Sequence, residues 1–198
     1  MSDIFEQYGV EDVRDLIREY PLAWVGGEGM RAEQYSLLPL LGEYDEAGSL
    51  TCLVGHMARR NPLFAGLSES PRATILFSGP SSYVSPEHAG SRTWAPTWNY
   101  AQLRVETEIA FEPDRTEAAL DMLTDAVADG SGWRKEELGP RYAAMLDAIV
   151  GFRATVTKVT GKFKLGQDEK PETLRAILAN HPDQDLVQWM RRFNRGRA

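Results

Sequence analysis

The stretch NYAQLRVETEIAF, residues 99–111, decides the fold class of this sequence. Its second part alternates strictly: Leu103, Val105, Thr107, Ile109 and Phe111 are separated by the polar Arg104, Glu106 and Glu108. A period of two is typical of a β-strand with one buried and one solvated face. The stretch therefore predicts a long amphipathic strand and a mainly β fold.

Other segments extend this pattern in both directions. We expect strands at 22–25, 34–41, 50–56, 73–78, 83–85 and 150–164, with a tight corner at Gly79-Pro80. Helices are expected at 10–20, from Asp114 to about Ala128, around 141–149, and after Pro171 and Asp183, with a helical turn within 58–67. Strands joined by short connections, with added helices, predict an α+β fold built on a small barrel. We expect one domain, 1–198, with an N-terminal helix at about 10–20 and a C-terminal helical segment at about 170–195.

Composition excludes several functional classes. The 198 residues carry a net charge of -7 and one cysteine, Cys52. Residues 47–198 are nearly neutral, which argues against direct nucleic-acid binding. The four arginines at 191–197 are interpreted as a solvated chain end. No apolar run approaches the roughly 20 residues of a membrane span, no signal peptide is visible, and a lone cysteine fits a reducing compartment. We expect a cytoplasmic protein without membrane contact.

Common catalytic arrangements are missing from the sequence. The three histidines, His56, His88 and His181, are isolated from one another and from Cys52. A metal site made of neighbouring ligands is therefore not expected. Neither a nucleophile elbow nor an S-x-x-K motif occurs, so the catalytic residues stay unknown.

Four segments contain polar, charged or aromatic residues that the folding of a barrel does not require. Residues 55–62, GHMARRNP, indicate anion binding or a polar strand-to-helix connection, and 77–86, FSGPSSYVSP, favours a rigid turn. Residues 94–100, WAPTWNY, predict core packing at a barrel end or a surface that stacks on a ring. In 161–168, GKFKLGQD, alternation puts two lysines on one face, where they share an anion or are solvated.

Together these segments resemble the PaiB family, described as FMN-binding negative transcriptional regulators with a pyridoxamine-phosphate-oxidase-like split β-barrel. The shared motifs are Gly55–Pro62, Phe77–Pro86, Pro96–Tyr100, and Ile149–Phe152 with Gly161–Leu165. The order and spacing of these motifs agree over about residues 10–180, which is nearly the whole chain.

The resemblance implies a homodimeric split barrel with FMN bound between the subunits. It places residues 34–41 and 56–61 along the flavin and its phosphate, Trp98 and Asn99 on the other wall, and the segment from Lys162 to Gln167 where it closes the site. The implied cofactor-binding residues are Ser36, Leu37, His56, Met57, Arg59, Arg60, Asn61, Trp98, Asn99, Lys162, Lys164 and Gln167. No metal is implied.

The sequence departs from the family pattern at three positions. Leu37, Ser81 and Arg104 stand where many members have histidine. These changes put proton-transfer chemistry in doubt more than FMN binding, and we interpret Arg104 as part of the polar face of its strand.

The first hypothesis is an FMN-binding flavoprotein of the PaiB type, with redox activity on an unknown small molecule left open. The alternatives are a regulatory protein that affects transcription indirectly, and a pocket that is lost or takes haem or another flavin-like ligand.

Overall fold

The structure, a computed structural model, describes residues 3–29, 31, 34–127 and 134–197. These residues pack as two compact units. We call residues 10–77 and 104–159 the central unit, and residues 1–9, 78–103 and 160–198 the terminal unit. The single domain expected from the sequence stays a prediction.

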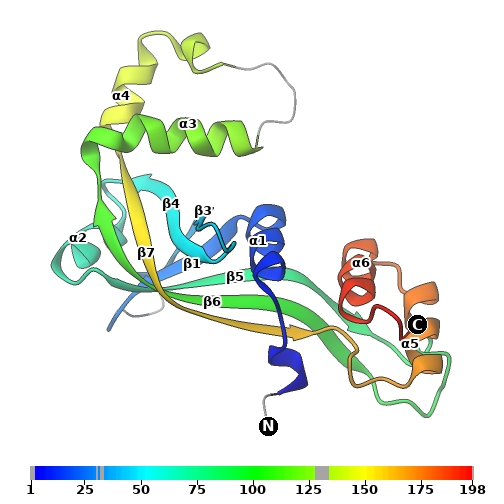
Figure 1. Cartoon of the computed structure of the whole chain (residues 1–198). Coiled ribbons are helices and arrows are strands. Elements are labelled where there is room, and N and C mark those ends of the chain that lie inside the picture. The colour runs from blue at the N-terminus through cyan, green and yellow to red at the C-terminus, as the bar shows by residue number, and fades with distance from the viewer. Residues whose placement is uncertain (1–2, 30, 32–33, 128–133, 198) are drawn as a thin grey trace. The chain divides into compact units, whose positions relative to one another are not determined.

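Strands and helices follow the expected order along the chain (Figure 1). The strands of the described residues are β1 Leu22–Gly27, β2 Ser36–Pro39, β3 Leu41–Tyr44, β4 Leu50–Ala58, β5 Arg72–Val84, β6 Thr97–Phe111 and β7 Ile149–Lys164. The helices are α1 Val10–Glu19, α2 Pro62–Glu69, α3 Thr116–Val127, α4 Arg141–Asp147, α5 Pro171–Asn180 and α6 Gln184–Phe193, with short 3-10 turns η1 Ile4–Glu6, η3 Pro113–Arg115 and η4 Lys135–Leu138. Among the described residues, no helix has the length and apolar character needed to cross a bilayer.

The sheet closes on itself in the central unit. Its strands follow the order β2-β1-β5-β6-β7-β4-β3, so β2 and β3 are the two edges. Along the chain, however, only Leu40 separates these two strands. The sheet must therefore curl until its edges meet, as the strands of a barrel do. This confirms the predicted α+β fold with a split β-barrel.

A glycine in β4 permits this closure. Gly55 pairs with Phe152 of β7, and a Cβ added at residue 55 would lie 2.5 Å from Cδ2 of Leu40. Leu40 is fully buried, so its side chain packs directly on the backbone of β4. Only glycine leaves room for this close approach.

The predicted strand 34–41 is divided in the structure. β2 ends at Pro39 and β3 begins at Leu41. Between them the backbone N–H of Leu40 donates to the carbonyl of Pro21 at 2.9 Å. The sequence prediction of one strand is wrong here, because Leu40 links the two edges of the barrel instead of continuing either one.

The predicted corner at Gly79-Pro80 is also wrong. Residues 73–78 and 83–84 belong to one strand, β5, which runs through Gly79 without a positive φ and ends before Ser85. What changes there is the phase of burial: Phe77 is buried before the Gly-Pro pair, and Pro80 and Val84 are buried after it. The pair therefore marks a shift in which side chains face inward, not a reversal of the chain.

Helix boundaries agree with the sequence prediction within a few residues. α3 begins at Thr116 rather than Asp114, and the Thr116 hydroxyl accepts a hydrogen bond from the Gly151 N–H at 2.9 Å. Its predicted end, Ala128, lies outside the described residues. As predicted, Asp183 caps α6, since its carboxylate accepts from the Leu186 N–H at 3.0 Å.

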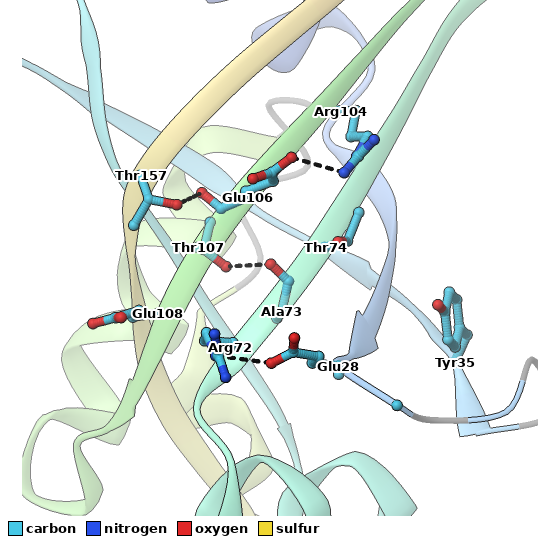
Figure 2. A pocket seen from close by; sticks show the side chains of 12 residues that line it. Glu28, Tyr35, Arg72, Ala73, Thr74, Arg104, Glu106, Thr107, Glu108 and Thr157 are labelled. Carbon is cyan, nitrogen blue, oxygen red and sulfur yellow. Dashed lines mark hydrogen bonds and ion pairs between the residues drawn. The ribbon is translucent and has the colours of Figure 1, made fainter.

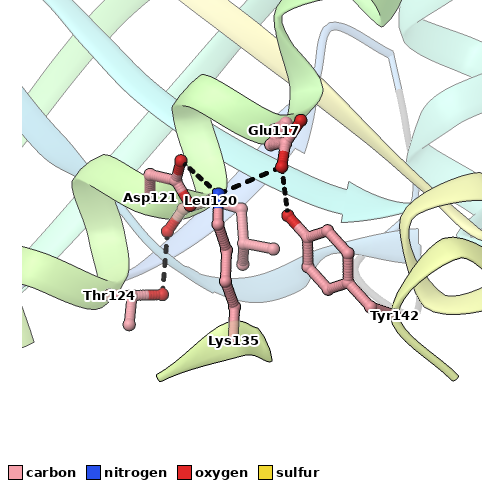
Figure 3. Close-up of polar contacts among 6 residues, drawn as sticks. All are labelled: Glu117, Leu120, Asp121, Thr124, Lys135 and Tyr142. Carbon is pink, nitrogen blue, oxygen red and sulfur yellow. Dashed lines mark hydrogen bonds and ion pairs between the residues drawn. The ribbon is translucent and has the colours of Figure 1, made fainter. Parts of the chain in front are cut away.

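In the central unit, a lysine of η4 forms ion pairs with two carboxylates of α3 (Figure 3). Lys135 Nζ lies 3.0 Å from the Glu117 carboxylate and 2.7 Å from that of Asp121. Hydrogen bonds to these two carboxylates hold the pKa of Lys135 well above its usual range. Tyr142 at the start of α4 donates to the same Glu117 oxygen at 2.8 Å, so Glu117 joins all three segments.

Candidate functional site

The first group of predicted site residues lies where β4 leads into α2. Asn61 is the N-cap of α2, and its Oδ1 accepts from the Leu63 N–H at 3.0 Å. Its amide also exchanges two hydrogen bonds with the Ser36 hydroxyl, at 3.0 and 2.9 Å. The structure thus brings Ser36 and Asn61 together across 25 positions, and both side chains are fixed by this contact.

His56 holds an unsatisfied nitrogen in this group. Its imidazole is half-buried, and its Nδ1 is enclosed without a hydrogen-bond partner among the described residues. Burial lowers the pKa of His56 below its ordinary value, so the ring is neutral near pH 7. Nε2 has no bond to a described residue either, but it is not among the enclosed atoms. His56 is therefore a polar group whose second nitrogen is open to a ligand.

The two adjacent arginines differ in their surroundings. Arg59 donates from Nε to the Asp147 carbonyl at 3.1 Å and lines a cavity of about 500 Å³ together with Asp114 and Glu117. These carboxylates disfavour a phosphate inside the cavity. Arg60 is exposed, and its side chain makes no hydrogen bond or ion pair with the described residues. Of the two, Arg60 has the guanidinium that is free for an anion.

Met57 and Leu37 have opposite environments. The Met57 side chain is 2% exposed and belongs to the barrel core. Leu37 is 43% exposed on β2 and lies opposite Trp24 of β1, which in turn lies opposite Leu76 of β5. We call Leu37, Trp24 and Leu76 the apolar row, because they form a line of exposed apolar side chains across three neighbouring strands.

The terminal unit exposes an aromatic pair. Trp98 is 56% and Tyr83 45% exposed, and their rings meet edge to face with centroids 6.4 Å apart. Core packing is therefore wrong as an interpretation of Trp98, whereas a surface that stacks on a ring fits its exposure. Lys164 donates to the Thr97 hydroxyl and, at 3.1 Å, to the Trp98 carbonyl, which fixes the backbone beside the indole.

Other predicted residues of the terminal unit already have protein partners. As alternation predicted, Lys162 and Lys164 lie on one face of β7, but Lys162 pairs with Asp3 at 3.3 Å. The hydrogen bond to Asp3 raises the pKa of Lys162. Gln167 bonds the backbone of Phe163 at 2.6 Å and of Leu165 at 2.7 Å, so it stabilises its own turn.

Asn99 faces the interior of the terminal unit. It is 2% exposed, and its Nδ2 lies 3.6 Å from the sulfur of Met190 on α6. The predicted site residues therefore form two groups. Ser36, Leu37, His56, Met57, Arg59, Arg60 and Asn61 belong to the central unit, and Trp98, Asn99, Lys162, Lys164 and Gln167 belong to the terminal unit.

A polar cavity of about 440 Å³ in the central unit was not predicted (Figure 2). Arg104 on its wall pairs with Glu106 at 2.7 Å, and Arg72 pairs with Glu28 at 2.8 Å. The interpretation of Arg104 as part of a polar strand face is thus confirmed. The alternation of apolar and polar residues in the sequence predicted the polar face of β6. It did not predict that segments of β1 and β5 complete the cavity.

Tyr35 closes one side of this cavity over a glycine. A Cβ added at Gly26 would lie 2.3 Å from the ring of Tyr35. The ring therefore lies directly against the backbone of β1. The glycine-rich segment 26–29 serves this contact and the turn after β1, which leads to the antiparallel strand β2.

Comparison with known proteins identifies a family. The pattern of a family described as "Putative FMN-binding domain" matches residues 1–158, well over half of the chain. No curated protein matches this sequence closely enough to count as a relative.

Solved structures share the fold at low sequence identity. A FAD and haem binding protein from Mycobacterium smegmatis matches with TM-score 0.58 and 20% identity, covering 86% of this chain and 78% of that one. The flavocytochrome Anf3 from Azotobacter vinelandii matches with TM-score 0.58 and 17% identity, covering 79% and 68%. A 5-nitroimidazole antibiotic resistance protein from Bacteroides thetaiotaomicron, so described provisionally, matches with TM-score 0.55 and 14% identity, covering 79% and 84%. Identities this low establish a shared fold and nothing further.

Proposed function

Because this chain belongs to the FMN-binding domain family, we propose that it is an FMN-binding flavoprotein of the PaiB type that works as a homodimer. The observation that carries the proposal is the family match over the whole central unit, where the GHMARRNP segment ends β4. When bound, FMN would supply electron-transfer chemistry, and the protein would supply binding and orientation. Turnover of a small molecule and a cytoplasmic location stay predictions.

The residues present fit the chemical parts of FMN. A phosphate needs fixed cationic donors, and Arg60 offers a guanidinium without a partner among the described residues. A flavin ring needs a polar edge contact, and His56, in the same compact unit as Arg60, has an open nitrogen. The aromatic pair Trp98 and Tyr83 belongs to the terminal unit and by itself offers a surface on which a ring can stack.

The haem alternative has one supporting observation, since one protein of shared fold is described as binding FAD and haem, and another as a flavocytochrome. An absorbance spectrum of the purified protein distinguishes the cofactors. A flavin spectrum and release of FMN on denaturation would support the proposal. A Soret band, or colourless protein that takes up no added FMN, would overturn it. Addition of NADH and NADPH then tests redox competence by bleaching of the flavin absorbance.

The two arginines provide a sharper test of phosphate binding. Arg60→Gln should weaken FMN affinity at least tenfold, because a charge-assisted contact is lost. Arg59→Gln should have a smaller effect, since its Nε already bonds the Asp147 carbonyl. Arg92→Gln removes the same charge from an exposed position and is the control. Equal FMN affinity in Arg60→Gln and the control would reject the assignment.

The proposed homodimer has physical support in the apolar row. Exposed apolar side chains in a line over three strands are typical of an interaction surface. A second copy of this chain would cover the 48% of Trp24 and 43% of Leu37 that are exposed. Trp24→Ser with Leu37→Ser should shift the sedimentation of the protein to that of a monomer. Met145→Ser, at a 47% exposed position on α4, is the control. A dimer that persists in the double variant would place the interface elsewhere.

The regulatory alternative predicts a different result. Direct DNA binding would give an affinity that falls steeply with salt, which the net charge of -7 disfavours. Absence of DNA binding at low salt, together with a flavin spectrum, would leave regulation only through a metabolite or a partner protein.

A further inference from the structure

A groove between α5 and α6 gathers arginines from two helices of the terminal unit. Its volume is about 290 Å³. The lining residues are Arg175, Leu178, Ala179, Arg191, Asn194, Arg195 and Gly196. Arg175 belongs to the middle of α5, whereas Arg191 and Arg195 belong to the end of α6 and the residues after it. Three arginines thus line one groove.

The wall formed by the C-terminal residues is held in place. Asn194 is 3% exposed, and its amide donates to the carbonyls of Leu165 at 2.9 Å and Met190 at 2.8 Å. Arg197 donates to Asn194 Oδ1 at 2.6 Å and to the Glu169 carbonyl at 2.7 Å. The interpretation of 191–197 as a solvated chain end is therefore wrong for these two residues. Their contacts fix the backbone that carries Arg195.

Within the described part of the chain, no carboxylate lines the groove. None of the ion pairs among those residues involves Arg175, Arg191 or Arg195, so they leave the positive charge of the groove uncompensated. The helix dipole accounts for a cation in the last turn of α6, but not for one in the middle of α5. Arg191 belongs to the last turn of α6 and Arg195 follows the helix end, and like charges that line one groove are unfavourable unless an anion or solvent compensates them. The arrangement is that of an anion site.

We propose that this groove binds a diphosphate group, either as free pyrophosphate or as part of a nucleoside diphosphate. Guanidinium groups bind phosphate oxygens through paired N–H donors, and three of them match the charge of a diphosphate better than that of a single phosphate. Leu178 and Ala179 add an apolar margin that a base or sugar can contact. The site is separate from the proposed FMN contacts, since none of those residues lines the groove.

Calorimetric titration of the purified, flavin-loaded protein with inorganic pyrophosphate tests this proposal, with ADP and inorganic phosphate in parallel. Pyrophosphate should bind and inorganic phosphate should bind at least tenfold more weakly. Tighter binding of ADP than of pyrophosphate identifies a nucleotide as the ligand, and equal binding identifies the diphosphate alone. The flavin absorbance should not change during the titration.

Variants locate the binding in the groove. Arg191→Gln or Arg195→Gln should weaken pyrophosphate binding about tenfold, and the double variant about a hundredfold. Both side chains are exposed, so the unfolding transition should be unchanged. Arg92→Gln, another exposed arginine of the terminal unit, should bind like the wild type.

Three outcomes would overturn the proposal. The first is no pyrophosphate binding, or equal binding in the double variant. The second is release of FMN by pyrophosphate, which would mean competition at the flavin phosphate. The third is binding of a single-stranded oligonucleotide that depends on these arginines and that pyrophosphate does not displace, which would indicate a nucleic-acid backbone as the ligand.

Discussion

Replacing His56 by phenylalanine is expected to stabilise the flavin-free protein, although the histidine belongs to the motif that ends β4. Nδ1 of His56 is enclosed without a partner among the described residues. A buried polar group left unpaired costs about 1–3 kcal/mol, and a phenyl ring of similar shape avoids that cost. Gly151, opposite in register on β7, puts no side chain beside the ring. Because His56 is only half-buried, we expect a gain of about 1 kcal/mol in the free energy of unfolding.

A second histidine gives the matched control. His181 is 2% exposed, and both its ring nitrogens are engaged: Nε2 lies 3.1 Å from the Tyr83 carbonyl, and Nδ1 accepts from the Asp183 N–H at 3.1 Å. The same substitution, His181→Phe, leaves these two backbone groups unpaired. It should lower the free energy of unfolding by about 1–3 kcal/mol. The two substitutions thus have opposite expected signs.

The pH dependence follows from the same burial. Burial lowers the pKa of His56 in the folded state, so the unfolded chain binds this proton more readily. The wild type must therefore lose stability as the pH falls below the ordinary histidine value of about 6.5. His56→Phe has no titrating group at this position and does not lose stability in this way. The difference in free energy of unfolding between the variant and the wild type should therefore grow on acidification, because all other titrating groups contribute equally to both proteins.

Urea denaturation followed by tryptophan fluorescence measures both effects, at neutral pH and about one unit below the ordinary histidine pKa. Titration with FMN should in addition show about tenfold weaker binding by His56→Phe, since Nε2 contacts the cofactor in the proposed function. A flavin-free variant less stable than the wild type, or an advantage that does not change with pH, would refute the reasoning about the enclosed nitrogen. Unchanged FMN affinity would refute the contact with Nε2.

Three further substitutions test the packing around the site. Glu43→Gln breaks the bidentate ion pair with Arg153 and should lower the free energy of unfolding by about 1 kcal/mol in chemical denaturation. Because that pair lowers the pKa of Glu43, the wild type should lose this stability advantage as the pH falls through the carboxyl range. Gly26→Ala should cost about 1–3 kcal/mol by displacing the ring of Tyr35, and a double-mutant cycle with Tyr35→Ala should remove most of that cost. Asn194→Leu leaves two backbone carbonyls unpaired and should lower the thermal midpoint by several degrees, whereas a midpoint equal to the wild type would show that its buried amide contributes nothing.

Local patterns in the sequence were sufficient to predict most of the strands and the face of the strand on which several side chains lie. Alternation correctly put Lys162 and Lys164 on one face of β7, and the residue types around Asp183 correctly predicted a helix cap. These properties depend on a few neighbouring residues, because backbone periodicity and capping are local. Cys52 lies in the apolar strand β4 and is buried, and burial raises the pKa of its thiol.

Partners of the same side chains could not be predicted in this way. Lys162 pairs with Asp3, Arg59 with the Asp147 carbonyl, and Ser36 with Asn61. Each contact joins residues far apart in the sequence, and its geometry depends on how the strands are ordered. Only after these partners are known can one see that Arg60 has no partner among the residues that the structure describes.

By itself, the sequence determined a mainly β chain with added helices, and its motifs resembled those of a flavin-binding family. Tertiary structure decided that β2 and β3 meet through Leu40, that β5 continues as one strand past Gly79-Pro80, and that Arg175 lines the same groove as Arg191 and Arg195. The physical reason is the same in each case. Hydrophobic periodicity records which side of a segment is buried, whereas closure of a barrel and clustering of charge depend on which distant segment packs against it.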